Sequence, residues 1–456
     1  MRERPLKIFF SGIGGSGVSA IACFMADKGH IVAGSDRIFD STPDNTLQNT
    51  LLSKGITIVP QDGSGLDTTF DFAVFSTAVE SNQPEILKAK DLGIPIKYRP
   101  DYLTEITSTY KTIAVSGTSG KSTASGLLAF LLKKLGYRPN FIGGGKVKQF
   151  KTASSPGNFL TGNSDYLVIE ACESDGSIVQ YRPEYSIVLN LALDHNPIDK
   201  TAGMLQSFMD NTGRHIIINA DDDNLARIKK NGLITFSILN PSAYRAVEIE
   251  YHSFSTDFTV NKTRFSLSSP GRHNLYNALS CIALLSQLGI PLDDIAAVLH
   301  EFRGIDRRFD IKLNDGNFLV IDDYAHNPHK ISFLMDAVKP ISDKICYIFQ
   351  PHGFAPTRMM KKEYIKVFAE NLRNSDHLIL FPIYYAGGTT SRDISSHDLA
   401  RGIRDGGKSV EVIENRSDIL NRLANYKTYI VFGARDDTLS DFAEEIADTI
   451  QNERDS

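Results

Sequence analysis

The sequence predicts an α/β protein of about three domains, in which helices cover parallel sheets. Three observations support this class. The chain of 456 residues is longer than one ordinary core accommodates. Short apolar segments of strand length alternate with longer segments of helical periodicity. Two glycine-rich turns, at Gly12–Gly17 and Gly117–Gly120, each follow an apolar strand and open a helix.

The composition is that of a globular protein. Apolar residues make up 41% of the chain and charged residues 23%, and the formal net charge is −5, so nothing favours binding to nucleic acid. No apolar run approaches the roughly 18 residues that span a bilayer, and MRERPLKIFFSGIGG predicts a first strand rather than a signal peptide. The four scattered cysteines are typical of reduced thiols. We expect a cytoplasmic monomer or dimer without stable membrane association.

We expect domains at residues 1–108, 109–305 and 306–456. The strands predicted in the first are Lys7–Ile13, His30–Ser35, Phe72–Ser76 and Ile94–Lys97. Those in the second are Lys111–Ser116, Tyr166–Cys172 and Tyr185–Leu191, followed by an antiparallel patch near 247–270 and a helix at Arg272–Leu288. Those in the third are Phe318–Asp322, Ile345–Gln350, Leu378–Pro382, Val410–Ile413 and Tyr429–Phe432.

The first glycine-rich turn, SGIGGSG, carries the G-x-G-x-x-G spacing at Gly12, Gly14 and Gly17. Glycines let the backbone approach a diphosphate, and the following helix N-terminus offers positive partial charge. Ser35 and Asp36 end the next strand, where an acid could hold a ribose. A purely structural glycine turn is the alternative. Taken alone, this segment predicts a nicotinamide cofactor.

The second turn lies in IAVSGTSGKST at 113–123. It lacks the first glycine of G-x-x-x-x-G-K-[ST], since Val115 occupies that position, so an ordinary GTPase-type loop is disfavoured. Its backbone can still surround phosphates, with Lys121 neutralising their charge and the Ser122 hydroxyl ligating Mg²⁺. We expect Lys121 to be an exposed loop side chain that contributes little packing. One chain therefore binds two phosphate-bearing molecules, as an ATP-driven enzyme acting on a nucleotide-linked substrate does.

The motifs, in this order, resemble those of the Mur ligases, and most closely of the members that add L-alanine. They are FSGIGGSGVSAIA (10–22), GSD (34–36), FSTAVESNQPEI (75–86), SGTSGKST (116–123), EACESD (170–175), LDH (193–195), GRHNLYNA (271–278), DRRFD (306–310), IDDYAHNP (321–328) and FQPH (349–352). The resemblance spans nearly the whole chain. It implies a Rossmann-like N-terminal domain that binds UDP, a central ATPase domain of the P-loop type, and a Rossmann-like C-terminal domain that closes over the site.

The resemblance also implies roles for individual residues. ATP would be bound by Gly117, Thr118, Ser119, Gly120, Lys121, Ser122, Thr123, Asn274, Arg308 and Asp323. Substrates would be bound by Gly12, Gly14, Gly15, Ser16, Gly17, Ser35, Asp36, Ser76, Thr77, His352 and Arg358. Mg²⁺ would be held by Ser122, Glu173 and His195, and the catalytic set is Lys121, Glu173, His195 and Arg308. Asn277 is as plausible a packing or capping amide as a ligand.

The implied reaction is ATP-dependent amide-bond formation in peptidoglycan precursor synthesis. UDP-N-acetylmuramate would be activated as an acyl phosphate, and an amino acid, L-alanine first among the candidates, would displace the phosphate. ATP and Mg²⁺ are the implied cofactors, and both substrates are small molecules. Arg308 and Asp323 lie beyond the second linker, so they would engage only when the domains close.

Several positions depart from the pattern of the alanine-adding members. Ser119 stands where that pattern has histidine, and Cys172 where it has aspartate. Gly353 replaces an arginine after the histidine of FQPH, and Arg435 replaces a glycine in FGARDD at 432–437. The region after the LDH motif is short, and YYAGGTTSRDISS at 384–396 is an unusual loop. These changes leave the nucleotide chemistry intact and put recognition of the amine in doubt. Arg358 or Arg392 could replace the missing guanidinium only from a different angle.

Three alternatives stay open. A recycling ligase would attach a ready-made tripeptide to UDP-N-acetylmuramate. A nicotinamide oxidoreductase would use Gly12–Gly17 and Asp36, but it leaves Lys121, Ser122 and Glu173 without a role. A ligase-like protein without activity would bind nucleotide and partners only. The acceptor specificity of the purified protein distinguishes the recycling ligase from an enzyme that adds an amino acid. Titration of a UDP-sugar against NAD distinguishes the oxidoreductase from both ligases.

Overall fold

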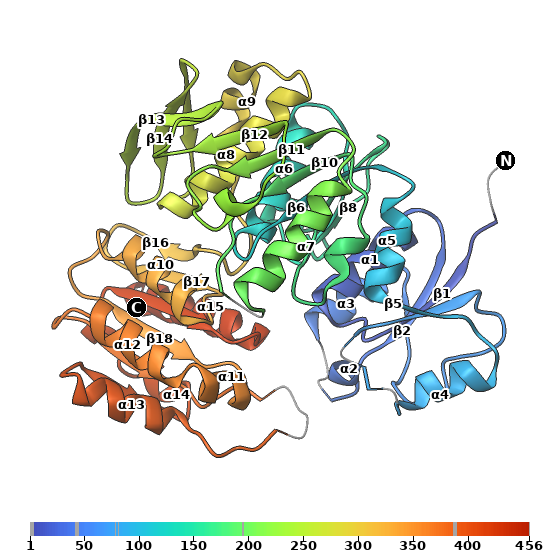
Figure 1. The fold of residues 1–456 in the computed structure, drawn as a ribbon. Helices are drawn as coiled ribbons and strands as arrows, with labels where there is room; N and C mark the ends of the chain where they lie inside the picture. The colour runs from blue at the N-terminus through green and yellow to red at the C-terminus, as the bar shows by residue number, and fades with distance from the viewer. Residues whose placement is uncertain are drawn as a thin grey trace. The chain divides into compact units, whose positions relative to one another are not determined.

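The computed structural model describes residues 4–41, 45–77, 79–80, 82–193, 196–385 and 390–455. The predicted α/β class is confirmed: the chain has a three-domain α/β fold built on three sheets (Figure 1). It divides into two compact units, Met1–Ile305 with two sheets and Asp306–Ser456 with one. The predicted boundary between residues 108 and 109 falls inside the first unit and stays a prediction. In the part described, no helix has both the length and the apolar character needed to cross a bilayer.

The first sheet has five parallel strands in the order β3-β2-β1-β4-β5. The strands are β1 (Lys7–Ser11), β2 (Ile31–Ser35), β3 (Thr57–Ile58), β4 (Phe72–Phe75) and β5 (Ile96–Tyr98). The helices are α1 (Ser16–Asp27), α2 (Arg37–Ser41), α3 (Thr46–Ser53), α4 (Pro84–Asp91) and α5 (Arg99–Thr107). The strand order reverses at β1, so the carboxyl ends of β1 and β4 form the edge where such sheets bind ligands.

The second sheet has ten strands in the order β15-β14-β13-β12-β11-β10-β6-β9-β7-β8. Its parallel centre comprises β6 (Lys111–Ser116), β7 (Asn140–Ile142), β9 (Tyr166–Glu170), β10 (Tyr185–Val188), β11 (His215–Asn219) and β12 (Leu233–Ser237). Its antiparallel additions are β8 (Phe159–Leu160) at one edge, and β14 (Thr256–Val260) and β15 (Thr263–Leu267), which follow β13 (Tyr244–Tyr251), at the other. The helices are α6 (Lys121–Lys134), α7 (Ile198–Asp210), α8 (Arg272–Gln287) and α9 (Leu292–Leu299).

The core of the second sheet explains why α6 and α8 are apolar around most of their surface. Both helices pack against the sheet and against each other. Nine consecutive residues of α6, from Ala124 to Leu132, are buried, and so are most residues of α8. A helix buried on nearly all sides is a rigid support, and α6 begins at the phosphate loop.

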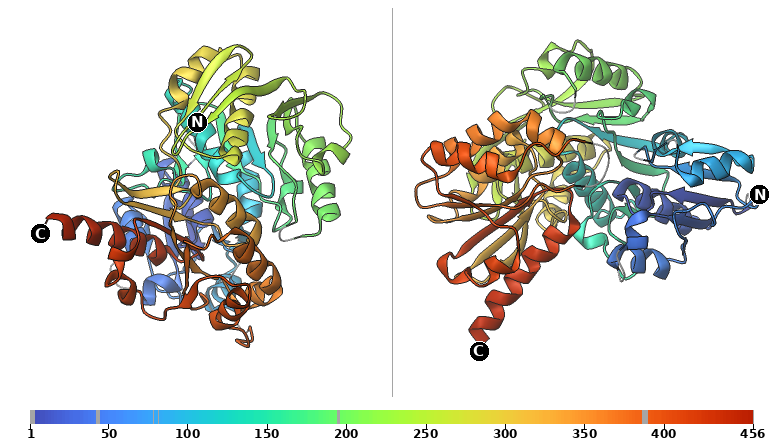
Figure 2. Two further views of the ribbon diagram at one scale, coloured as in Figure 1. Left: turned by 90° about the vertical axis from the view of Figure 1, so that its left-hand side faces the viewer. Right: turned by 90° about the horizontal axis from the view of Figure 1, so that it is seen from below.

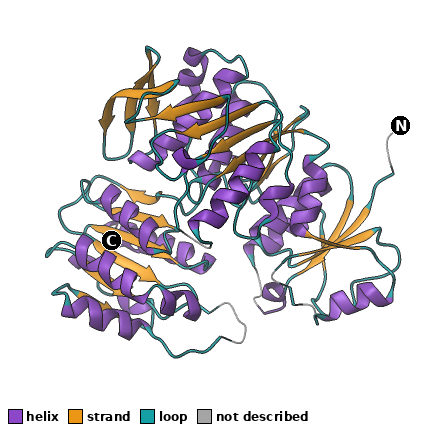
Figure 3. Ribbon diagram, in the orientation of Figure 1, coloured by secondary structure: helices purple, strands orange, loops and turns teal. Residues whose placement is uncertain are grey.

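The second unit holds one sheet in the order β16-β17-β21-β18-β19-β20, parallel except for β16. The strands are β16 (Asp310–Asn314), β17 (Leu319–Asp323), β18 (Cys346–Gln350), β19 (His377–Leu380), β20 (Val410–Val412) and β21 (Thr428–Gly433). The helices are α10 (Pro328–Val338), α11 (Phe354–Met359), α12 (Lys361–Asn371), α13 (Ser396–Asp405), α14 (Ser417–Leu420) and α15 (Asp437–Asp455). Helices lie on both faces (Figure 3), and the last turns of α15 extend beyond the sheet (Figure 2).

The strands named from the sequence are present, with ends that differ by a few residues. The predicted patch near 247–270 corresponds to β13–β15, and the predicted helix Arg272–Leu288 corresponds to α8. The strands β11 and β12 were not expected. Their segments, RHIIIN and LITFS, are short and lie among polar residues, so periodicity alone does not separate them from loops.

Candidate active site

The phosphate loop connects β6 to α6 in the first unit, as the sequence predicts. Gly117 has a φ of 135° and Gly120 a φ of 87°, values that L-residues rarely adopt. A Cβ on Gly120 would also lie 2.4 Å from the Oδ1 atom of Asn277. Glycine is therefore required at both positions. The loop can turn tightly without the first glycine of the longer pattern.

Asn190, just beyond β10, holds the loop in place. Its Oδ1 atom accepts hydrogen bonds from the Thr118 hydroxyl at 2.8 Å and from the Ser119 backbone N–H at 2.9 Å. Its Nδ2 atom donates to the Ser119 carbonyl oxygen at 3.0 Å. Asn190 was not among the residues predicted from the sequence. The sequence feature that could have indicated Asn190 is a polar side chain at the end of a buried strand. That strand, β10, pairs with β6 and places Val188 beside Ser116.

Lys121 is largely buried, which corrects the expectation of an exposed loop lysine. Its side chain is 14% exposed, and its Nζ atom donates to Glu173 Oε2 at 2.9 Å and to the Gly117 carbonyl oxygen at 2.6 Å. Burial is the largest single influence and lowers the pKa of Lys121, but Glu173, Cys172 and Glu170 together outweigh it, so the pKa is raised. Lys121 is therefore a cation at neutral pH, next to the loop that would hold phosphate.

Ser122, at the start of α6, contacts a different carboxylate from the one expected. Its hydroxyl donates to Glu170 Oε2 at 2.9 Å. Glu170 Oε1 accepts the backbone N–H groups of Gly144 at 2.6 Å and Gly145 at 3.3 Å. The motif EACESD thus divides its two glutamates: Glu170 faces Ser122, and Glu173 faces Lys121. Thr123 follows in the same helical turn.

His195, predicted as a catalytic and metal-binding residue, lies outside the described residues. Asn274 is buried and donates from Nδ2 to the Pro270 carbonyl oxygen at 2.8 Å, which ties it to the start of α8. Asn277 is also buried and packs against Gly120, as the packing interpretation of this residue expects. Both amides are buried, and of the two Asn277 is the one that lies against the loop.

The N-terminal turn joins β1 to α1 as predicted. Asp36 Oδ2 accepts the Gly14 backbone N–H at 2.8 Å, and its Oδ1 accepts the Ile38 N–H at 3.1 Å. A Cβ on Gly14 would lie 2.8 Å from Asp36 Oδ2, and one on Gly12 would lie 2.9 Å from the Ser76 Cβ. Asp36 therefore orders the turn itself. Gly15 precedes α1 and Ser16 and Gly17 begin it, while Thr77 is exposed beyond β4.

Glu85, whose role was not predicted from the sequence, is a fully buried carboxyl group beneath this turn. It accepts hydrogen bonds from the hydroxyls of Ser11 and Ser35, which end β1 and β2. Burial raises the pKa of Glu85. The predicted substrate residue Ser35 is thus committed to this internal network.

Two contacts join the N-terminal turn to the central sheet within the first unit. Arg99 Nη2 pairs with Asp175 Oδ2 at 2.6 Å, and the Arg99 side chain lies 3.4 Å from the position of a Cβ on Gly17. Asn158 is fully buried and donates from Nδ2 to the Ser16 carbonyl oxygen at 2.7 Å. Asp175 belongs to the same motif as Glu170, so the motif connects both glycine-rich turns.

In the second unit, the two arginines of DRRFD have different environments. Arg307 is buried and donates from Nε to Asp322 at 3.4 Å and from Nη1 to the Asp436 carbonyl oxygen at 2.9 Å. Arg308, the predicted catalytic residue, is half-buried and its guanidinium lies 4.7 Å from the centre of the Tyr324 ring. Arg307 therefore stabilises the fold, and Arg308 is the more accessible of the two.

Asp323, the predicted ribose ligand, ends β17. Its carboxylate accepts the backbone N–H groups of Phe309 at 2.7 Å and Ala325 at 2.8 Å. Burial raises the pKa of Asp323, while the charge of Arg308 opposes this shift.

The predicted substrate residues His352 and Arg358 are close in sequence, but their side chains contact different partners. The His352 ring stacks on Tyr384 with centroids 5.8 Å apart. Arg358 pairs with Asp393 and donates to the Ser391 carbonyl oxygen at 2.9 Å. Its charge is therefore neutralised by a neighbouring loop.

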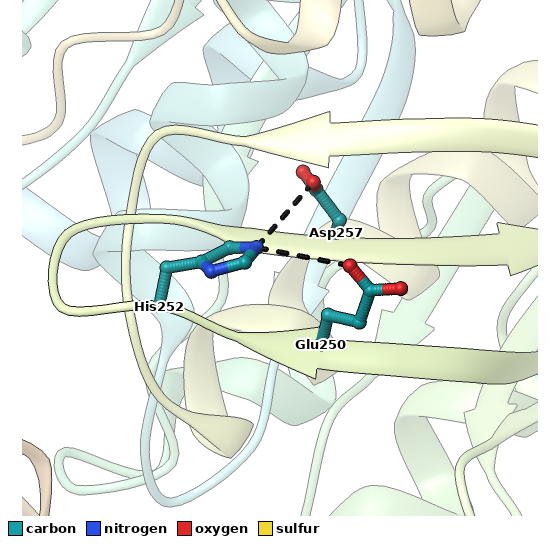
Figure 4. Close-up of side chains that lie close together, drawn as sticks. All are labelled: Glu250, His252 and Asp257. Carbon is teal, nitrogen blue, oxygen red and sulfur yellow. Dashed lines mark ion pairs between the residues drawn. The ribbon is translucent and has the colours of Figure 1, made fainter.

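Glu250, His252 and Asp257, three residues of types that bind metal ions, lie together at β13 and β14 (Figure 4). They are distant in sequence from the phosphate loop. His252 Nε2 is 3.5 Å from Asp257 Oδ2 and 4.0 Å from Glu250 Oε2. Arg264 contacts both carboxylates, at 3.2 Å and 3.5 Å. Because this guanidinium already compensates the acids, the cluster is an exposed network of ion pairs.

Fold and site together define a nucleotide-binding α/β protein of the phosphate-loop type. Three family models match the chain in order: the Mur ligase family catalytic domain at residues 7–111, the Mur ligase middle domain at 115–285, and the Mur ligase glutamate ligase domain at 307–435. The chain belongs to the Mur ligase family.

Three similar proteins illustrate the relationship. The UDP-N-acetylmuramate–L-alanine ligase of Thermosynechococcus vestitus is 35% identical, over 93% of this chain and 90% of its own. That of Fusobacterium nucleatum is 32% identical, over 98% and 97%. The crystal structure of UDP-N-acetylmuramate-alanine ligase from Thermotoga maritima superposes with a TM-score of 0.83 at 27% identity, covering 98% of this chain and all of its own.

Proposed function

We propose that this protein is an ADP-forming ligase that uses ATP to join L-alanine to UDP-N-acetylmuramate in peptidoglycan precursor synthesis. The observation that carries the proposal is the phosphate loop, in which Lys121 and Ser122 each face a separate carboxylate. The names and nearly full-length similarity of the relatives support the choice of substrates.

The chemistry requires activation, because condensing a carboxylate with an amine in water is unfavourable. A carboxylate oxygen of the muramyl group attacks the γ-phosphorus of ATP, and the bond to ADP breaks. The amine of L-alanine then attacks the acyl carbon, and phosphate leaves as the amine loses a proton. No covalent bond to the protein forms. The chain positions the reactants and compensates negative charge.

Lys121 is the main cation for the transferred phosphoryl group. In the structure its ammonium is held by Glu173 and the Gly117 carbonyl oxygen. A small rotation about its side-chain bonds would direct the Lys121 ammonium to phosphate oxygens that the backbone N–H groups of the loop hold. Arg308 and Asp323, in the second unit, are proposed to contact the ATP phosphates and ribose. Asn274 is proposed to lie beside the adenine.

The donor set at Ser122 fits Mg²⁺, since a hydroxyl and a carboxylate are the hard oxygen ligands that this ion prefers. The oxygens of Ser122 and Glu170 are already 2.9 Å apart. We propose that Ser122 and Glu170 would hold one Mg²⁺, with Glu173 nearby, and that His195 would serve a second. Bound Mg²⁺ would supply neutralisation of phosphate charge.

The uridine diphosphate of the substrate is proposed to bind at the N-terminal turn. Gly12, Gly14 and Gly17 let the turn pack closely on Ser76, Asp36 and Arg99, and the N-terminus of α1 that follows would offer N–H groups to an anion. Asp36 holds the turn from behind. The second substrate, the amino acid, is proposed to meet the second unit near His352. Both substrates are small molecules, and a cytoplasmic location fits the use of ATP.

The test is phosphate release by the purified protein with ATP, Mg²⁺ and UDP-N-acetylmuramate across a panel of amino acids and peptides. We expect release with L-alanine and formation of UDP-N-acetylmuramoyl-L-alanine by mass spectrometry. A tripeptide as the sole acceptor would establish the recycling ligase instead. Turnover with NAD and no ligation would establish an oxidoreductase, and binding without turnover would establish an inactive protein.

A further inference from the structure

Four loops of the second unit meet at the carboxyl ends of its parallel strands. Main-chain hydrogen bonds join three of them: the Gly353 N–H donates to the Tyr384 carbonyl oxygen at 2.9 Å, and the Ala434 N–H donates to the Gln350 carbonyl oxygen at 2.9 Å. The Arg435 N–H approaches His352 Nδ1 at 3.4 Å. We call His326, His352, Tyr384 and Arg435 the carboxyl-end cluster.

The two imidazoles of the carboxyl-end cluster are neutral at physiological pH. Their ring centroids are 6.5 Å apart. Burial lowers the pKa of His326 to about 2, and burial lowers the pKa of His352 as well. The positive charge of Arg435 contributes to lowering both pKa values. Neither histidine can therefore supply the positive charge that an amino-acid carboxylate requires.

The other arginines near this edge are engaged. Arg358 is paired with Asp393. Arg392 lies over the Tyr385 ring, 4.1 Å from its centroid. Arg308 lies over Tyr324 and faces the Asp323 carboxylate. Arg435 is exposed and, among the described residues, no ion pair of its guanidinium is found.

We infer that Arg435 recognises the α-carboxylate of the incoming amino acid, beside His352. The inference rests on the proposed function and adds a residue to its amine site. Gly353 follows His352 with a φ of 75° and has no side chain to offer a carboxylate. Arg435 lies two residues beyond the end of β21, with its backbone N–H 3.4 Å from His352 Nδ1, and its exposed side chain carries a planar fork that can bind a carboxylate through two hydrogen bonds.

The test compares two acceptors, L-alanine and L-alaninamide, which lacks the carboxylate charge. Phosphate release is measured with ATP and UDP-N-acetylmuramate saturating. In Arg435→Ala, kcat/KM for L-alanine should fall about 10- to 150-fold, as expected for losing a charged hydrogen bond. The value for L-alaninamide should change less than about threefold, because the lost interaction needs the carboxylate. Arg435→Lys should retain part of the activity.

The controls are Arg401→Ala, an exposed arginine on α13, and Arg358→Ala, the competing candidate. Arg401→Ala should leave the preference for L-alanine over L-alaninamide unchanged, and Arg358→Ala, which tests the competing residue, should alter it less than Arg435→Ala does. Equal losses with both acceptors in Arg435→Ala, a rise in the KM for ATP alone, or an effect confined to Arg358→Ala would each overturn the inference. A wild-type protein that accepts no amino acid would overturn it together with the amino-acid part of the proposed function.

Discussion

The ion pair between Lys121 and Glu173 shows how one residue serves both the fold and the chemistry. Glu173 is 3% exposed, so Lys121 takes the place of water as a partner of its carboxylate. Removing one partner of a buried pair leaves an uncompensated charge. The lysine therefore cannot be replaced without a cost in stability.

We predict that Lys121→Met lowers ligation at least about 100-fold, because a positioned cation is lost from the transferred phosphoryl group. It should also lower the unfolding free energy by about 3 kcal/mol, because Glu173 loses its partner. Lys121→Met/Glu173→Gln should recover most of the stability and none of the activity. Denaturant unfolding and phosphate release measure the two effects. Recovery of activity in the double variant would contradict the role of Lys121.

Because of His326, we expect the stability of the second unit to depend on pH. Its folded pKa of about 2 lies below the usual value of 6.5, so between these values the unfolded chain binds the extra proton. Stability is thus full above pH 6.5 and falls as the pH decreases through this window. Burial raises the pKa of Asp322 to about 6, which acts in the opposite direction and is common to wild type and variant.

We predict that His326→Gln loses less stability than wild type between pH 7 and pH 5, by about 1–2 kcal/mol. Urea unfolding at the two pH values measures the difference. Identical pH dependence in both proteins would show that His326 is not buried as a neutral base.

At the scale of elements, each glycine-rich turn is held by one side chain from a neighbouring strand end. Asp36 holds the first turn and Asn190 holds the phosphate loop. Asn190 is suited to the loop because one amide both accepts from and donates to Ser119. An aspartate could accept but not donate.

We predict that Asn190→Asp raises the KM for ATP about tenfold or more, because it loses the bond to the Ser119 carbonyl and adds negative charge near the phosphates. The KM for UDP-N-acetylmuramate should change little. Isothermal titration with a nucleotide and with the UDP-substrate separates the two effects, and equal weakening of both would argue against a local role.

Gly14→Val tests the assignment of the first turn. The new side chain would begin 2.8 Å from Asp36 and displace the carboxylate that orders the turn. The KM for UDP-N-acetylmuramate should rise far more than the KM for ATP. If the affinity for ATP fell instead, the two turns would have been assigned to the wrong nucleotides.

The limits of prediction from the sequence are visible at these same residues. Strand, glycine turn and helix were predictable at both sites because apolar runs lead directly into glycines. The carboxylate that contacts Ser122 was not predictable, because the motif EACESD contains two glutamates. Only the register of β9 against β6, with Glu170 beside Val115, decides which one faces the loop. The burial of Lys121 likewise depends on Glu173, which lies in the loop that follows β9.

At the scale of the whole molecule, the proposed reaction has three requirements, and we assign one of them to each sheet. We propose that the first sheet positions the UDP-linked substrate and the second positions ATP, while the sheet of the second unit carries Arg308, Asp323 and the carboxyl-end cluster. The three family models follow one another along the chain in the same order as the three sheets. The central claim is that the muramyl carboxylate is activated by direct transfer of phosphate from ATP.

That claim is tested most directly with UDP-N-acetylmuramate labelled with ¹⁸O in its carboxylate. Each turnover with L-alanine should transfer one labelled oxygen to the released phosphate, because the acyl carbon keeps one oxygen and the phosphate leaves with the other. Mass spectrometry of the phosphate measures the transfer. Unlabelled phosphate, or label recovered in AMP, would contradict an acyl-phosphate mechanism for this protein.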